Sequence, residues 1–228
     1  MKYILIIFTL FFSDTLLGQT ITPNQHPGKT PIHILDDKLT DISFALSLRV
    51  LESDYNGSLV RLRRASDNAL QDFGWGDNDK VDVSAINTWR GTSAVYVHTW
   101  YDQSGLGRNA VQTINSRQPR FFPSTTNPYF KGDGANDYLI IDTPNGIQDV
   151  TNNGVEGTVL GVMNASKKNQ HTFGVLTGVN RWSTHINWSN NNVYFDPGIC
   201  CNNPRYFNNT SNLSKWAHYT FIRTTTND

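Results

Sequence analysis

The sequence predicts an all-β protein, an antiparallel β-sandwich with one or two short helices near its N-terminus. Short runs of β-branched and aromatic residues follow one another along the chain, separated by Gly, Asn or Pro at intervals of about ten residues. Glutamate, a strong helix former, occurs only as Glu52 and Glu156, whereas Asn, Thr, Ser and Gly are abundant. A chain of 228 residues is long enough for one large sandwich domain.

The first 18 residues predict an export signal. Lys2 gives the start a positive charge, residues 3–12 are an almost unbroken apolar run, and Gly18 offers a small residue at a cleavage point. The alternative is a membrane anchor, but a bilayer-spanning helix needs about 20 apolar residues, more than this run supplies. After the leader, no segment is long and apolar enough to span a membrane. We therefore expect a protein that is secreted or held at the cell surface.

The rest of the chain divides into a linker and one domain. Residues 19–38 contain three prolines and read as a linker, and residues 39–228 as the sandwich. Apolar positions within residues 41–51 allow a short helix. Residues 216–223 predict a central strand, and the chain ends at Asp228, where a returning strand is expected. The sequence thus indicates a sandwich that is truncated at its C-terminus.

The first elements of the domain have clear local signals. Residues 59–64 and 69–73 predict a hairpin. Asp82 is suited to cap a helix over residues 83–89, and Gly91 to end it. Further strands are expected at residues 95–101, 137–142, 158–163, 171–176, 182–188, 192–195 and 216–223.

Charge and cysteine usage exclude several classes of protein. Nineteen Lys and Arg balance nineteen Asp and Glu, so no basic surplus is available to bind nucleic acid. The two cysteines, Cys200 and Cys201, are adjacent, which rules out a framework of several disulfides within the chain. The six histidines show no spacing typical of metal ligands.

Two polar turns have both a structural and a functional interpretation. Residues 102–107, DQSGLG, can simply fix the exit of a strand, or they can line the rim of a sugar or calcium site. Asp133, Asn136 and Asp137 place three oxygen-bearing side chains around a second turn, which suggests a calcium site or a plain polar turn. Calcium is the one cofactor that the sequence suggests, and no other is expected.

Aromatic residues of the second half are candidates for binding a sugar, because a ring can cover the flat C–H face of a pyranose or furanose. Strand alternation places Trp182 and Trp188 on one face and His185 on the other. Trp100 and Trp216 are expected to fill the core. The full set of candidate aromatic residues is Trp182, His185, Trp188, Tyr194 and Tyr206.

Three motifs in the first half resemble one enzyme family. LVRLRRASDN at residues 59–68, VDVSA at 81–85 and TWYDQSGLGRN at 99–109 resemble the start of the catalytic module of α-L-arabinofuranosidase B enzymes. The resemblance covers roughly residues 42–121 in order and spacing. It implies a β-sandwich that acts on arabinose-containing polysaccharide.

A second set of residues resembles the laminin-G-like, concanavalin A-like sandwich of exported bacterial proteins. It comprises residues 102–109, 130–138, 194–201 and 216–218. Both families are sandwiches that handle sugars, so the resemblances together imply a polysaccharide or other glycan as the partner. Fold analogy alone does not establish an activity.

The chain departs from the arabinofuranosidase pattern where catalysis is concerned. That family has a glutamate nucleophile on a core strand, and no glutamate follows Glu156 here. Its acid/base aspartate lies near the end of the module, beyond Asp228. Its Cys-Cys pair precedes a Phe-Asp-Tyr-Gly stretch, whereas here FDPG at residues 195–198 comes before the pair. Asp196 is therefore a weak catalytic candidate, and we expect no hydrolysis of arabinofuranosides.

The same comparison places a sugar-binding site at Asp196, Trp188, Cys200 and Cys201. Because adjacent cysteines can close only a strained ring, a Cys200–Cys201 disulfide needs a fold that holds it, often at a ligand site. The resembling enzymes use such a pair as an apolar wall beside the sugar; free or intermolecular thiols are the alternative. The expected function is a lectin-like module, with an arabinofuranosidase or a ligand-free adhesion domain as the alternatives.

Overall fold

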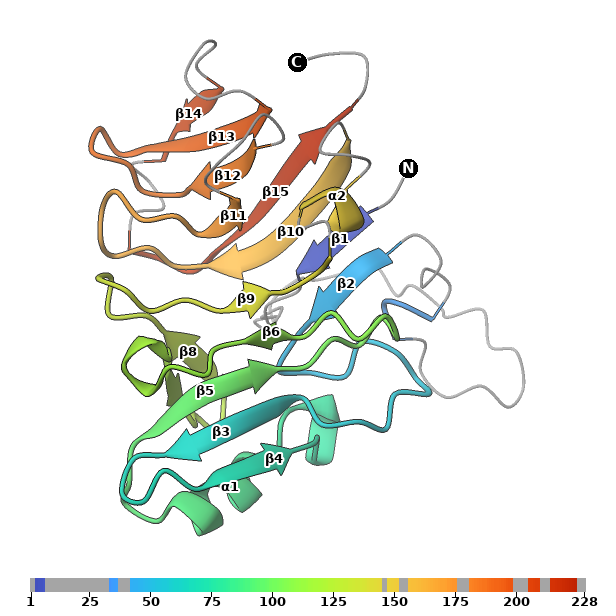
Figure 1. Cartoon of the computed structure of the whole chain (residues 1–228), viewed down its shortest axis with the longest axis vertical. Coiled ribbons are helices and arrows are strands. Elements are labelled where there is room, and N and C mark those ends of the chain that lie inside the picture. Colours follow the sequence, from blue (N-terminus) through green and yellow to red (C-terminus); the bar gives the residue numbers. More distant parts are fainter. Residues whose placement is uncertain are drawn as a thin grey trace, which may run out of the picture.

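The described residues form three β-sheets, and these confirm the all-β sandwich that the sequence predicts (Figure 1). The structure is a computed structural model. It describes residues 3–6, 33–36, 42–144, 147–151, 156–175, 181–198, 205–209 and 214–224. Within these residues no helix is long and apolar enough to cross a membrane.

The largest sheet contains the first predicted hairpin. Its seven strands are antiparallel, with the order β4-β3-β5-β6-β9 and with β7 and β8 continuing from β5. The predicted strands at residues 59–64, 69–73 and 95–101 are all present, and residues 137–142 contribute only two strand residues. The strands are β3 (Val60–Arg64), β4 (Leu70–Phe73), β5 (Val95–Trp100), β6 (Ala110–Val111), β7 (Arg120–Phe122), β8 (Tyr129–Lys131) and β9 (Ile140–Ile141).

The second sheet is mixed, with the order β15-β10-β1-β2. It corrects the helix that we expected over residues 41–51, because this segment forms β2. All five residues of β2 are buried, and a continuous buried run is compatible with a buried strand as well as with a short helix. The strands are β15 (Ala217–Arg223), β10 (Gly157–Met163), β1 (Tyr3–Ile6) and β2 (Ile42–Leu46).

The third sheet is a small antiparallel meander with the order β11-β12-β13-β14. In Figure 1 it lies at the end of the molecule that also carries β15, far from β3 and β4. Its strands are β11 (Phe173–Val175), β12 (Arg181–His185), β13 (Asn192–Gly198) and β14 (Tyr206–Asn208).

The helix after the first hairpin has the predicted ends. In α1 (Val83–Arg90), the side chain of Asp82 accepts a hydrogen bond from the Ala85 backbone N–H at 2.9 Å. Gly91 follows the helix with a φ of 56°, a conformation that favours glycine. A second short helix, α2 (Ile147–Val150), was not expected.

One apolar cluster joins the three sheets into a single core. It includes Leu62 of β3, Val159 of β10, Phe221 of β15 and the fully buried Trp182 of β12. Trp100 belongs to this core, as predicted, whereas Trp216 is 44% exposed, so its assignment to the core was wrong.

Candidate functional site

The pairing of β12, β13 and β14 decides which side chains share a face of the small sheet. Directly opposite residues of an antiparallel pair point to the same side. Ser183 lies opposite Asp196, and His185 opposite Tyr194. Tyr194 in turn lies opposite Tyr206. These five residues therefore occupy one face.

The other face of the small sheet belongs to the core. Trp182 is fully buried, and its ring meets that of Phe195 edge-on with centroids 5.3 Å apart. Phe195 also contacts Phe221 of β15, at a centroid distance of 5.4 Å. The sheet is therefore anchored through one face; its second face is buried at Ser183 and His185 and accessible at Tyr206.

Five rings form a continuous row along this second face and the turn beside it. Neighbouring centroids are 4.1 Å apart for His171 and His185, 4.4 Å for His185 and Trp188, 6.4 Å for Trp188 and Tyr194, and 5.5 Å for Tyr194 and Tyr206. We call these five residues the aromatic row. The sequence singled out four of them. It missed His171, which lies ahead of β11 and joins the row only through its contact with His185.

Trp188 reaches the row because β12 ends before it. After His185 the chain turns, and the Trp188 N–H donates to Asn192 O at 3.0 Å while the Asn191 N–H donates to Trp188 O at 2.9 Å. The Trp188 ring consequently lies with His185, and the prediction that it would share a face with Trp182 was wrong. Strand alternation holds only within a strand.

The row is buried at its second ring, His185, and exposed at both ends. His185 is 4% exposed, whereas Tyr206 is 54% exposed. Trp188 and Tyr194 are half-buried, and His171 is exposed. Half-buried rings are held in place by their neighbours and still offer a flat surface to a ligand.

Asp196 lies on the same face, two positions along β13 from Tyr194. It is half-buried and does not stand at a strand end, as the sequence suggested, because Pro197 and Gly198 continue β13. Within the described residues, the structure thus brings two predicted sugar-binding residues, Asp196 and Trp188, to one face. Cys200 and Cys201 lie outside the described residues, so their disulfide stays a prediction.

A cavity of about 300 Å³ lies on the core side of the small sheet, against β15. Its walls include Phe195, Phe207 and Ile222, and its polar residues are Arg205, Thr220 and Tyr206, the exposed end of the aromatic row. Sugar hydroxyl groups need a denser set of hydrogen-bonding partners. The aromatic row is therefore the better candidate for a sugar site.

The DQSGLG motif forms a turn whose buried aspartate is fully hydrogen-bonded. Asp102 is 7% exposed, and its Oδ1 accepts hydrogen bonds from the backbone N–H groups of Ala45 at 2.7 Å and Ser104 at 3.0 Å. Its Oδ2 accepts from the Ser104 hydroxyl at 2.7 Å and the Arg108 N–H at 2.9 Å. Four donors satisfy the carboxylate, and they fasten β2 to the end of β5. This bears out the structural interpretation of the motif.

Other residues of the family-like motifs also serve the scaffold. Gln103 accepts from the Leu51 N–H at 2.9 Å and donates to Arg49 O at 2.8 Å. Arg63 is 7% exposed and donates to Gln118 Oε1 at 2.6 Å and Asn68 Oδ1 at 2.9 Å. The motifs behind the arabinofuranosidase resemblance therefore build the fold around β3 and β5.

Burial and a hydrogen bond to Asp72 shift the pKa of Tyr101, which follows β5. Arg61 holds Asp72 through two hydrogen bonds of 2.8 and 2.6 Å, and this pairing lowers the pKa of the Asp72 carboxyl. Tyr101 donates to Asp72 Oδ1 at 2.6 Å. Burial, followed by this hydrogen bond to a carboxylate, raises the pKa of Tyr101 to about 12.

The loop that suggested calcium is stabilised by its own hydrogen bonds. Asp133 Oδ1 accepts from the backbone N–H groups of Ala135 at 2.7 Å and Asn136 at 3.2 Å. The Asp133 N–H donates to Asp137 Oδ2 at 2.9 Å. The Lys167 ammonium donates to the carbonyl of Asp133 at 3.0 Å and supplies the positive charge at this loop. We therefore favour the polar-turn interpretation, and the described residues contain no cluster of three metal-ligating side chains.

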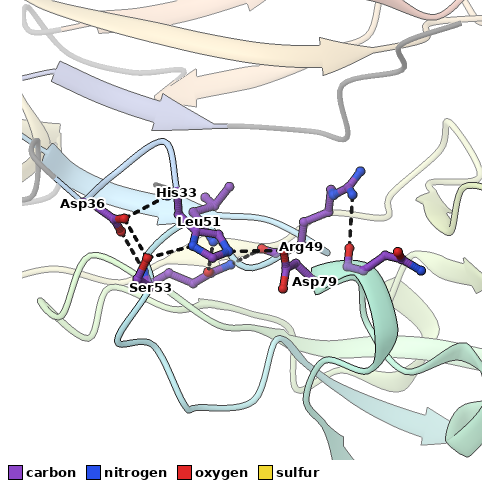
Figure 2. A network of polar contacts seen from close by, with 8 residues as sticks. His33, Asp36, Arg49, Leu51, Ser53 and Asp79 are labelled. Atoms are coloured by element: carbon purple, nitrogen blue, oxygen red, sulfur yellow. Dashed lines mark hydrogen bonds and ion pairs between the residues drawn. The ribbon is translucent and has the colours of Figure 1, made fainter. Parts of the chain in front are cut away.

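A network around His33 superficially resembles a Ser-His-Asp triad (Figure 2). His33 Nδ1 lies 2.9 Å from Ser53 Oγ, and His33 Nε2 lies 3.3 Å from Asp79 Oδ2. However, the Ser53 hydroxyl donates to Asp36 Oδ2 at 2.7 Å, so its proton is directed away from the histidine that would act as the base. The network joins residues 33–36 to the segments that contain Ser53 and Asp79, and we assign it no catalytic role.

The carboxylates that a glycosidase would need are dispersed. Glu52 lies in a turn, and its Oε1 accepts from the Asp54 N–H at 3.0 Å. Asp142 follows β9 in the seven-stranded sheet. Of the five paired residues on the face with the aromatic row, Asp196 alone is a carboxylate.

Comparisons with known proteins add a short partial match. No family model and no curated protein matches the sequence. Among solved structures, an arabinofuranosidase complexed with arabinofuranosyl-α-1,2-xylobiose and a GH54 α-L-arabinofuranosidase soaked with a cyclic sulfate inhibitor match at 31% identity and a TM-score of 0.27. Each match covers 28% of this chain and 14% of the other. This overlap is too small to place the protein in that family.

Proposed function

We propose that this protein is an exported, non-catalytic glycan-binding module with a β-sandwich fold. The observation that carries the proposal is the aromatic row, which shares one face of the small sheet with Asp196. The row contains four successive ring-to-ring contacts. An extended row of this kind suits successive sugar units along a glycan.

The chemistry of this face suits a carbohydrate. Half-buried rings such as Trp188 and Tyr194 can cover the C–H face of a sugar while losing little conformational entropy. The Asp196 carboxylate can accept hydrogen bonds from sugar hydroxyl groups, and a charged acceptor makes such bonds stronger. Rings supply contact area, and the carboxylate supplies orientation.

Binding is favoured over hydrolysis because Asp196 is the one carboxylate among the described residues that are paired on this face. A retaining glycosidase needs two carboxyl groups about 5 Å apart, one as nucleophile and one as proton donor. Asp196 alone can hold hydroxyl groups, but it cannot also protonate a leaving group. The alternative function, an α-L-arabinofuranosidase, rests on the motif resemblance, and the residues of those motifs have structural roles here.

A glycan array probed with the exported protein tests the proposal. We expect retention on a subset of glycans, with arabinose-containing polysaccharides as the first candidates, and no release of product. Turnover of p-nitrophenyl arabinofuranoside that Asp196→Asn abolishes would establish the enzyme instead. Absence of binding to every glycan on the array would favour the remaining alternative, a ligand-free adhesion domain.

A further inference from the structure

The leader occupies a structural position in the mixed sheet. Strand β1 (Tyr3–Ile6) lies between β10 and β2 and runs parallel to both. Ile4 is in register with Val159 on one side, and Leu5 with Ala45 on the other. The same four residues belong to the predicted export signal of residues 1–18, and cleavage after Gly18 would remove them.

We propose that leader removal opens a strand-wide slot between β10 and β2, and that a separate polypeptide fills it with an extended apolar strand. The inference rests on the export part of the proposed function and is independent of glycan binding. Adjacent strands lie about 4.8 Å apart, so the strands beside the slot are about 10 Å apart. That distance is too wide for direct hydrogen bonds between β10 and β2.

The slot is held open by contacts that do not involve the leader. Strand β10 pairs with β15 over seven residues, from Gly157 to Met163. Strand β2 is held from the other side, because Asp102 accepts from the Ala45 N–H and Arg108 donates to Ser43 O at 2.8 Å. Closing the slot would require one of these attachments to break.

The chain that remains after cleavage has its own anchor ahead of β2. The Leu35 N–H donates to Leu51 O at 2.9 Å, and Leu35 is fully buried against Ile42 and Ala45. Around it, His33 and Asp36 make the hydrogen bonds drawn in Figure 2. Removal of residues 1–18 therefore leaves β2 in place.

Open strand edges define the chemistry of the occupant. Without β1, the inner edges of β10 and β2 present unpaired N–H and C=O groups to each other, and such edges recruit an extended segment. The side chains beside the slot are buried and mostly apolar: Ile42, Leu46 and Val159 are each at most 5% exposed. The occupant is therefore an apolar, β-branched strand without proline.

A strand of the same domain cannot easily move into the slot. Apart from β2, which Asp102 and Arg108 hold in place, every strand that cleavage leaves in the described part of the chain keeps a hydrogen-bonded strand neighbour. Moving one of these strands into the slot would break its present backbone hydrogen bonds to a neighbour for each new set formed with β10 or β2. A separate polypeptide has no ladder to lose, and it can bind as β1 does, parallel to both flanking strands.

A peptide corresponding to residues 2–8 serves as the probe, with the exported, cleaved protein as the receptor. We expect one peptide to bind per chain and those amide protons of residues 158–160 that face the slot, not β15, to become protected from hydrogen exchange. The same peptide carrying Leu5→Pro should not bind, because proline cannot complete the ladder. In the full-length chain, Leu5→Pro should leave these amides unprotected, a readout that remains if the cleaved form purifies poorly.

Three outcomes would overturn the proposal. The first is an exported protein that retains residues 1–18 on N-terminal sequencing. The second is a cleaved protein that protects the slot-facing amides of residues 158–160 without peptide, whether by closing the slot or by pairing with a second copy. The third is equal binding of the two peptides. None of these outcomes bears on glycan binding at the aromatic row, so the two proposals can fail separately.

Discussion

Replacing Asp102 tests whether the motif shared with arabinofuranosidases is scaffold or site. In Asp102→Ala, the N–H groups of Ala45, Ser104 and Arg108 lose their acceptor, together with the Ser104 hydroxyl. Two of these N–H groups make fully buried hydrogen bonds, and each unsatisfied buried donor costs about 1–3 kcal/mol. We expect a loss of about 3–5 kcal/mol in the free energy of unfolding, or about 10 °C in Tm for a domain of this size.

The assay is thermal and urea unfolding of the wild type, Asp102→Ala and Asp196→Ala, combined with glycan binding by the folded fraction. Asp102→Ala should lose stability and keep its affinity, whereas Asp196→Ala should lose affinity with a smaller effect on stability. Asp102→Asn should fall between the wild type and Asp102→Ala, because the amide keeps one acceptor oxygen. If Asp102→Ala unfolds at the wild-type Tm but no longer binds glycan, the scaffold assignment is wrong.

Three further predictions concern pH, calcium and the cysteine pair. The pKa values of Tyr55 and Tyr101 are raised from 10.0 to about 12. The unfolded chain therefore releases protons that the folded chain keeps, and the free energy of unfolding should fall between pH 10 and 12; Phe variants should flatten this decline. Excess calcium should leave Tm unchanged, and a calcium-dependent rise that Asp133→Asn removes would contradict the polar-turn interpretation. Cys200 and Cys201 should resist alkylation until reduced, as intact mass shows; two alkyl groups added without reductant would refute the disulfide.

Much of the fold could be predicted because its signals are local. The cap at Asp82 and the stop at Gly91 depend only on adjacent residues, and both ends of α1 were predicted correctly. The strands that became β3, β5, β10 and β15 carry strong β-branched or aromatic runs. Their approximate positions followed from composition and turn residues alone.

The elements that were missed depend on distant partners. Strand β2 is a run of five buried residues, and its identity as a strand is fixed by pairing with β1 and by Asp102, which lies 57 residues from Ala45 in the sequence. Strands β6 and β9 are two residues long and exist through their mutual pairing. No local pattern identifies such elements, because tertiary contacts decide them.

The candidate site was predicted in part. Residue chemistry suggested Asp196 and Trp188, and the structure brings both to one face. The side of Trp188 was mispredicted, because the end of β12 at His185 depends on the turn that Asn191 and Asn192 make with Trp188. Ser183 enters the site only through the register of β12 with β13, which composition does not reveal.

The most direct test of the account is a calorimetric titration of the exported protein with a glycan retained on the array. Trp188→Ala removes the central ring of the aromatic row, and Trp75→Ala, at a tryptophan that is 45% exposed in the loop after β4, is the matched control. We predict that Trp188→Ala weakens binding at least tenfold, equivalent to about 1.4 kcal/mol, while Trp75→Ala binds like the wild type. Equal affinity for all three proteins would contradict a glycan site at the aromatic row.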